Sequence, residues 1–440
     1  MKQKFIILGL LLAALTLLSG CMSTLDQMYC LPKRSEDAQN LQSSIDDAML
    51  SLDYCAPVSG ENRQTVQTAD LDGDGDMEYL VFAKGSSEKP LKILIFALEG
   101  ERYVHRATLD SNGTAFHQVE YVQMDGHAGM ELVVGRQVSD QVLGSVSVYS
   151  FDGTQMQRLM STNYTKFLTC DMDSDGKKEL MILRSGHTGT DNGVAELYRV
   201  VDGAMERSNE ASMSEPTDHL KRIIVGKLQD GEPAVYVAST VGEKAIITDV
   251  FALVDGVFRN VSFSNESGTS VQTLRNYYVY AVDIDGDGVV ELPNLINMKS
   301  MDSARATERQ YLIRWYAMRL DGTEVDKQFT FHNYVGGWYF HLEQELVSRV
   351  TVVQTGQAHE FYIWDAGFTN AEKILTIYAL TGPDREAQAV ENGGFLLQRT
   401  ESVVYSGVLE NRAYDFEITR DVVVDGFHLI QQEWKTGETD

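Results

Sequence analysis

The chain has 440 residues, of which 64 are Asp or Glu and 37 are Lys or Arg, so its formal net charge is −27. A surface this acidic repels nucleic acid and anionic lipid, and we therefore expect no nucleic-acid partner. Its four cysteines are too few and too scattered for a disulfide framework or a zinc site. Cys30 and Cys55 could pair outside the cell, a question that cysteine spacing does not decide.

Residues 1–20 have the layout of a signal peptide for export. Lys2 and Lys4 precede an apolar run from Phe5 to Leu18, which is shorter than the roughly 20 residues that a membrane-spanning helix needs. The run ends in Leu-Ser-Gly-Cys, a tetrad that resembles the bacterial lipobox. The resemblance implies cleavage before Cys21 and acylation of Cys21. The mature protein would then be an exported lipoprotein, anchored to the bacterial cell membrane and facing outside the cytoplasm.

Residues 21–55 are expected to form an anchor, a stalk and one amphipathic helix. The helix is predicted over residues 36–52, with Ser35 as its cap and two acidic residues at its positive end. Apolar side chains recur at helical spacing, at Ala38, Leu41, Ile45, Met49 and Leu52. This apolar face should pack against the body of the protein.

Residues 56–330 carry a repeated pattern of short apolar runs separated by Gly, Asp and Asn turns, which is typical of strands. Three copies of one segment are clear: TADLDGDGDMEYLVF from Thr68, TCDMDSDGKKELMIL from Thr169 and AVDIDGDGVVELPNL from Ala281. Two weaker copies begin at Tyr121 and Ile223. The five loop starts, near residues 70, 123, 171, 227 and 283, lie roughly fifty residues apart, the length of one four-stranded propeller blade.

A second element recurs in phase with the first: an aromatic-rich strand followed by a tight hairpin turn. The turns are Glu99-Gly100, Asp152-Gly153, Asp202-Gly203, Asp255-Gly256 and Asp321-Gly322. Two markers in register predict a mainly β fold, a β-propeller of four-stranded blades with a short N-terminal helix.

Residues 331–440 keep strand-like runs but lose the acidic loop. We interpret this segment as a small C-terminal α+β region; the alternative is that it supplies divergent blades that close the ring. A helix is predicted from Thr419 onward, although Gly426 is unfavourable inside it. Its apolar side would be formed by Val422, Val423, Phe427, Ile430 and Trp434.

Three acidic loops alternate aspartates in the way that a hard cation requires. Calcium takes about six to eight oxygen ligands, and alternate Asp side chains on a tightly curved loop converge on one point. The predicted side-chain ligands are Asp70, Asp72, Asp74 and Glu78 in the first loop, Asp171, Asp173, Asp175 and Glu179 in the second, and Asp283, Asp285, Asp287 and Glu291 in the third. A glycine at the sixth position would let the following backbone carbonyl join the ligands. These carbonyls belong to Asp76, Lys177 and Val289.

An EF-hand begins in the same way but ends with Glu at its twelfth position and lies between helices. The twelfth positions here are Val81, Ile182 and Asn294, and the flanks are β-like, so the EF-hand is excluded. The pattern D-x-D-x-D-G-x-x-E between strands instead resembles the calcium loops of the FG-GAP and VCBS repeat families, the propeller repeats of integrin α-chains and many bacterial surface proteins. The resemblance covers residues 64 to about 330 and implies about three calcium ions, held by the residues named above. These families usually end the loop in Asp, whereas all three loops here end in Glu.

The expected role of calcium is structural. Several carboxylates crowded in one loop repel one another without a cation, so the ion should stiffen the blade turns and couple folding to calcium. The two degenerate loops, at Gln123 and Lys227, are expected to be metal-free.

The chain contains no G-x-S-x-G elbow, Walker loop, G-x-G-x-x-G helix entry or H-E-x-x-H motif. Its histidines are dispersed, and its tryptophans are expected in the core. We therefore predict a monomeric surface binding module rather than an enzyme, with an unknown protein or glycan as ligand and residues 185–193 as one candidate contact loop. The alternative is a secreted polysaccharide hydrolase or lyase on a propeller scaffold, which a paired acid and base in one exposed cleft would mark.

Overall fold

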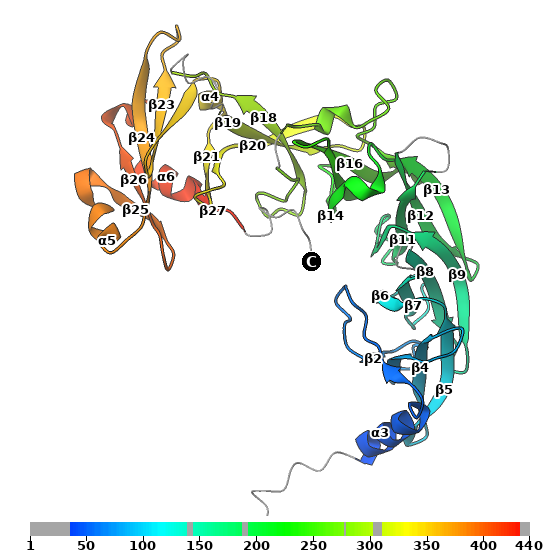
Figure 1. Cartoon of the computed structure of the whole chain (residues 1–440). Helices are drawn as coiled ribbons and strands as arrows, with labels where there is room; N and C mark the ends of the chain where they lie inside the picture. Colours follow the sequence, from blue (N-terminus) through cyan, green and yellow to red (C-terminus); the bar gives the residue numbers. More distant parts are fainter. Residues whose placement is uncertain (1–35, 139–143, 187–191, 277–278, 302–309, 432–440) are drawn as a thin grey trace, which may run out of the picture.

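The computed structural model describes residues 36–138, 144–186, 192–276, 279–301 and 310–431 (Figure 1). Cys21, Cys30, Ser35 and Trp434 lie outside the described residues, as do residues 187–191 of the candidate contact loop. Within the described ranges, no helix is both long enough and apolar enough to cross a membrane.

Helix α3 (Glu36–Ala48) begins where the sequence predicts a helix and ends earlier than residue 52. Its apolar face packs on the first sheet, as expected. Ile45, only 4% exposed, belongs to one hydrophobic cluster with Val81, Leu94 and Phe96. Burial of these side chains holds the helix against the body.

The first four sheets are antiparallel, and their main strands follow one another in chain order, as in propeller blades. The first sheet contains β1 (Asp53–Tyr54), β2 (Val66–Ala69), β3 (Glu78–Lys84), β4 (Leu91–Glu99) and β5 (Arg102–Ser111). The second contains β6 (Ala115–Val122), β7 (Glu131–Gln137), β8 (Gly144–Phe151) and β9 (Met156–Tyr164). The third contains β10 (Lys166–Cys170), β11 (Glu179–Ser185), β12 (Gly193–Val201) and β13 (Ala204–Ser212). The fourth contains β14 (Leu220–Lys227), β15 (Pro233–Val241), β16 (Ala245–Val254) and β17 (Val257–Asn260).

Two five-stranded sheets complete the described part of the chain. The fifth contains β18 (Glu291–Asn297), β19 (Tyr311–Met318), β20 (Glu324–Asn333), β21 (Trp338–Leu342) and β27 (Phe427–Leu429). The sixth contains β22 (Val350–Thr355), β23 (Ala358–Trp364), β24 (Ala371–Leu380), β25 (Phe395–Arg399) and β26 (Val404–Leu409). Short helices α4 (Gln344–Val347) and α5 (Arg385–Gln388) accompany them. The boundary expected at residue 330 falls inside β20.

The hydrophobic core is divided among the interfaces between successive sheets. Each of the five interfaces has a cluster with side chains from both sheets, for example Leu80 and Phe116, Val148 and Leu180, Leu183 and Val235, Tyr236 and Tyr316, and Phe331 and Phe361. This packing between four- and five-stranded sheets confirms the mainly β, propeller-like fold. In Figure 1 the sheets follow an open arc with the first and sixth sheets at its two ends. Among the described residues, no core cluster joins those two sheets.

In two of the five predicted tight hairpins, both turn residues have positive φ. Asp202 and Gly203 have φ of 49° and 77°, and Asp255 and Gly256 have φ of 52° and 74°. Two consecutive positive φ angles are typical of the type I′ turn, whose twist matches that of the flanking strands.

The predicted C-terminal helix is wrong beyond Gly426. Helix α6 (Arg420–Gly426) begins where the sequence predicts a helix, and Thr419 caps it, since its hydroxyl accepts the N–H of Val422 at 3.3 Å. The chain then extends from Phe427 and pairs with β21, with Phe427 opposite Phe340. Pairing with a free sheet edge satisfies the backbone that the helix would otherwise have used.

Cys170 and three tryptophans lie in the core. Cys170 is 1% exposed and packs within the cluster between the third and fourth sheets. Trp315, Trp338 and Trp364 are all buried. These tryptophans therefore contribute to packing rather than presenting an exposed aromatic surface.

Candidate metal centres

Each intact acidic loop joins two antiparallel segments, and the first and ninth loop positions lie at its base. Glu78 pairs with Ala69 in the β2–β3 ladder, and Glu179 pairs with Cys170 in the β10–β11 ladder. In the third loop, an isolated bridge pairs Glu291 with Val282. In each loop the ninth residue therefore pairs with the residue that directly precedes the first. This pairing places the first and ninth positions side by side.

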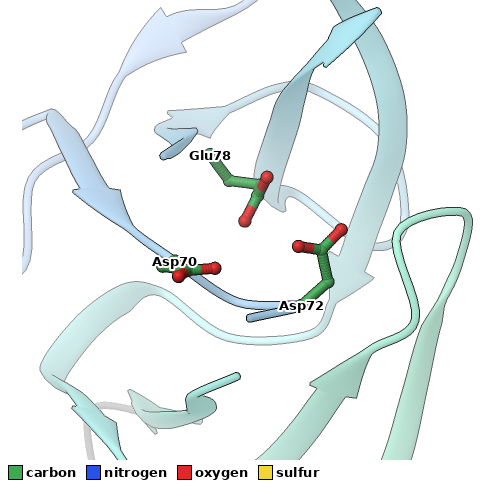
Figure 2. Close-up of side chains that lie close together, drawn as sticks. All are labelled: Asp70, Asp72 and Glu78. Atoms are coloured by element: carbon green, nitrogen blue, oxygen red, sulfur yellow. The ribbon is translucent and has the colours of Figure 1, made fainter. Parts of the chain in front are cut away.

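The structure brings together three of the four predicted carboxylates in each loop. Ligand oxygens of Asp70, Asp72 and Glu78 lie within 4.8 Å of one another, and Figure 2 shows all three side chains around one space. The same relation holds for Asp171, Asp173 and Glu179, and for Asp283, Asp285 and Glu291. Oxygen-only groups of this kind suit a hard divalent cation.

The fifth-position aspartates do not join these groups. The Asp74 carboxylate accepts the N–H of Asp76 at 2.8 Å, and the carboxylates of Asp175 and Asp287 make the same bond two residues on. Asp287 also forms an ion pair with Lys327 at 2.7 Å. Each of these carboxylates shapes its loop by accepting a backbone N–H two residues on. That they are direct ligands stays a prediction.

The first-position aspartates hold the loop in its curved form. Asp70 accepts the N–H groups of Gly73 at 2.7 Å and Gly75 at 3.2 Å. Asp283 likewise accepts the N–H of Gly288 at 2.9 Å. The φ of Gly75 is 93° and that of Gly288 is 85°, a region that favours glycine and explains why this residue stands at the sixth position.

The ninth-position glutamates are the most buried members of each group. One oxygen of Glu78, Glu179 and Glu291 accepts the N–H of the second loop residue, at 2.8, 2.8 and 3.1 Å. Burial, partly offset by this hydrogen bond, raises the pKa of all three glutamates to about 7. A nearby cation would reverse this shift, because it favours the ionised form.

Two buried oxygens in these groups have no hydrogen-bond partner: Glu291 Oε1 and Asp171 Oδ1. Glu291 is completely buried. A buried carboxylate oxygen without a partner is costly, and a metal ion would satisfy it. The residues present therefore fit a divalent cation in the second and third loops on grounds independent of their spacing.

The degenerate loop at Gln123 replaces the cation with an internal donor. The side-chain N–H₂ of Gln123 donates to the carbonyl oxygens of His127 and Gly129, the latter at 3.1 Å. Gly129 occupies the seventh loop position, whose carbonyl the sequence interpretation assigns to calcium in the intact loops. Glu131 keeps its bond to the N–H of Met124 at 2.8 Å. That the loop binds no metal stays a prediction.

The loops also connect neighbouring sheets. The N–H of Met130 in the second loop donates to the carbonyl of Asp70 in the first at 3.1 Å. The N–H of Lys178 donates to the carbonyl of Gln123 at 2.8 Å. Because Asp70 is both a candidate ligand and an acceptor for the next sheet, an ion in its loop would stabilise the junction between the two sheets.

Replacing Glu131 by Gln should remove a pH-dependent loss of stability. Burial raises the pKa of Glu131 from 4.5 to about 7, so the folded protein holds this proton more tightly than the unfolded chain does. The stabilisation is complete below about pH 4.5 and is lost as the pH rises through about 7. In saturating calcium, Glu131→Gln should resemble the wild type at about pH 5 and exceed it in stability at about pH 8, as measured by urea unfolding.

The control for this experiment is Glu101→Gln, which changes an exposed glutamate in the β4–β5 turn. Its stability should follow the wild type at both pH values. If the stability of Glu131→Gln falls between about pH 5 and pH 8 as much as that of the wild type, the pH-dependent loss does not come from Glu131.

No family model and no curated protein matches the chain. Solved structures that resemble it include a protein from Lactobacillus plantarum, with 11% identity, 72% of this chain and 85% of that chain covered, and a TM-score of 0.29. The exotype rhamnogalacturonan lyase YesX has 11% identity, with 75% and 67% covered and a TM-score of 0.30. A rhamnogalacturonan lyase from Bacillus licheniformis has 10% identity, with 73% and 72% covered and a TM-score of 0.31. Likeness at these TM-scores carries no argument about the activity of this chain.

Proposed function

We propose that the protein is a cell-envelope lipoprotein whose calcium-stabilised array of FG-GAP/VCBS-type blades binds a ligand outside the cytoplasm. Cys21 would carry the lipid that anchors it to the bacterial membrane. The blades would act as a monomeric binding module for a glycan or protein. The alternative is a secreted polysaccharide hydrolase or lyase on the same scaffold.

One observation carries this proposal: three loops each gather two aspartates and a buried glutamate around one space. Calcium is the cation that this chemistry favours, because it accepts flexible, oxygen-only coordination. Asp70, Asp171 and Asp283 would hold the ion with their loop partners, and the carbonyls of Asp76, Lys177 and Val289 would complete the set. The ion supplies a fixed positive charge that neutralises the crowded carboxylates.

A structural role for these carboxylates favours binding over catalysis. Asp70 and Asp283 are engaged by loop N–H groups, and Glu78 and Glu291 by the N–H of the second loop position. A general acid and base must reach a substrate and exchange protons with it. Carboxylates committed to loop amides and a cation are poorly suited to that task.

The experiment combines localisation with retention on polysaccharides. Wild-type protein should fractionate with the bacterial membrane, and Cys21→Ala should move to the soluble fraction. Purified protein in calcium should be retained on at least one member of a panel of neutral and acidic polysaccharides, without releasing reducing ends or unsaturated products. Release of reducing ends or unsaturated products would show that the protein is a polysaccharide hydrolase or lyase. A wild-type protein found in the soluble fraction would contradict the lipid anchor at Cys21.

A further inference from the structure

Two pockets adjoin each other in the region of the fifth and sixth sheets. The first has a volume of about 190 Å³ and is lined by residues of β19, β20 and the β22–β23 hairpin, including His332 and His359. The second has a volume of about 250 Å³ and includes Arg275. Leu295 and Tyr311 line both pockets, so the two share a wall.

The first pocket collects polar atoms that find no hydrogen-bond partner in the part of the chain that the structure describes. Both ring nitrogens of His332, Nδ1 of His359 and Oε1 of Gln310 are buried and have no hydrogen-bond partner. Burial lowers the pKa of His332 to about 3 and that of His359 to about 4, so both rings are neutral at physiological pH. A neutral imidazole offers one donor and one acceptor. The pocket can therefore both donate hydrogen bonds to a bound molecule and accept them from it.

The second pocket contains a buried cation that forms no ion pair with any residue in the described ranges. Arg275 is 4% exposed. Its Nε and Nη1 donate to the carbonyls of Val279 and Thr273 and to the hydroxyl of Thr248, whereas Nη2 has no partner. Burial lowers the pKa of Arg275 only to about 10, so the side chain stays charged. A buried charge of this kind calls for an anion.

The neighbours of Arg275 reach the first pocket. Tyr316, Tyr280 and Tyr334 lie near its guanidinium, and Tyr334 lines the first pocket. The shared wall and this shared neighbour make the two pockets parts of one region, cationic at one end and neutral but hydrogen-bonding at the other. The aromatic rings of Tyr311 and Phe331 in the lining suit the apolar faces of a ring-shaped ligand.

We propose that the two pockets form one binding site for a small polyhydroxylated carboxylate, the chemistry of a uronic acid. The carboxylate pairs with Nη2 of Arg275, and the hydroxyl groups bond to His332, His359 and Gln310. This inference rests on the proposed binding function and names its ligand class. Because the net charge of −27 slows the approach of anions, the affinity must come from the desolvated charge inside the site.

The test uses the full chain in calcium and four probes: D-glucuronic acid, D-galacturonic acid, D-glucose and D-galactose. Binding is measured by calorimetry and by ligand-observed NMR. Each acid should bind about tenfold or more tightly than its neutral counterpart, the preference expected for one charge-assisted hydrogen bond. Arg275→Gln should lose this preference.

His332→Phe keeps the folding test separate from the binding test. Phenylalanine retains an aromatic ring and removes two unsatisfied nitrogens, so the unfolding midpoint without ligand should stay the same or rise. Affinity for both acids should fall about tenfold or more. His127→Ala, which changes an exposed histidine of the degenerate loop, should leave binding unchanged.

Three outcomes would overturn the site. One is equal affinity for the acids and the neutral sugars; another is full binding by folded His332→Phe; the third is no binding of any probe by calcium-loaded protein. The same protein preparations are also tested for retention on polysaccharides, which measures the proposed binding function independently of this site. Retention that survives His332→Phe would keep the proposed binding function and place its ligand elsewhere.

Discussion

In excess calcium the protein should unfold at a markedly higher temperature than in EGTA. Each of the three loops gathers carboxylate oxygens within 4.8 Å, and removing the cation leaves them to repel one another. At a free calcium concentration about 100 times Kd, each site stabilises the folded state by about 2.7 kcal/mol. Thermal unfolding followed by calorimetry measures the shift. Magnesium should produce a smaller shift, because it prefers rigid octahedral geometry and keeps its water.

Single substitutions assign this stabilisation to individual loops. Asp72→Asn, Asp173→Asn and Asp285→Asn each remove one charge from a different group, and each should abolish about a third of the calcium response if the sites are equivalent. The matched control is Asp125→Asn, at the same position in the loop where Gln123 supplies the internal donor. If calcium leaves the unfolding temperature of the wild-type protein unchanged, the proposed calcium sites are wrong.

Asp249→Ala should be the most destabilising single substitution in the fourth sheet. Asp249 is completely buried in β16 and accepts four hydrogen bonds. They come from Ser214 N at 2.8 Å, Ser214 Oγ at 2.6 Å, Ser270 Oγ at 2.6 Å and Asn260 Nδ2 at 2.8 Å. Alanine removes the acceptor of the buried Ser214 and Ser270 donors, and the expected loss in the free energy of unfolding is about 3–5 kcal/mol, measured by urea titration.

The network around Asp249 explains why the loss should be large. Ser214 follows the last strand of the third sheet, whereas Asp249 and Asn260 belong to the fourth. One carboxylate therefore joins two blades and the loop that contains Ser270. Asp218→Ala, at an exposed position near this junction, should change stability by no more than about 0.5 kcal/mol. Equal effects of the two substitutions would show that the buried network contributes little.

The acidic loops were predictable because their geometry is local. Nine residues between paired strands determine which side chains can meet, so the spacing of Asp70, Asp72 and Glu78 is sufficient to predict their convergence. The hairpin turns were predictable for the same reason, since each contains a glycine with positive φ, and two Asp-Gly pairs have positive φ at both residues. The spacing did not predict that the Asp74 carboxylate would lie outside this group. In the folded loop, that carboxylate accepts the N–H of Asp76.

What the sequence by itself determined is the β class, the blade period, the turns and the positions of the three acidic loops, because each follows from a short repeated pattern. Only the tertiary structure decided that the sheets form an open arc and that β27 returns to pair with β21. It alone also brought Arg275, His332 and His359 to adjoining pockets. These features depend on residues far apart in the chain, whose meeting is governed by sheet-to-sheet packing that no local spacing encodes.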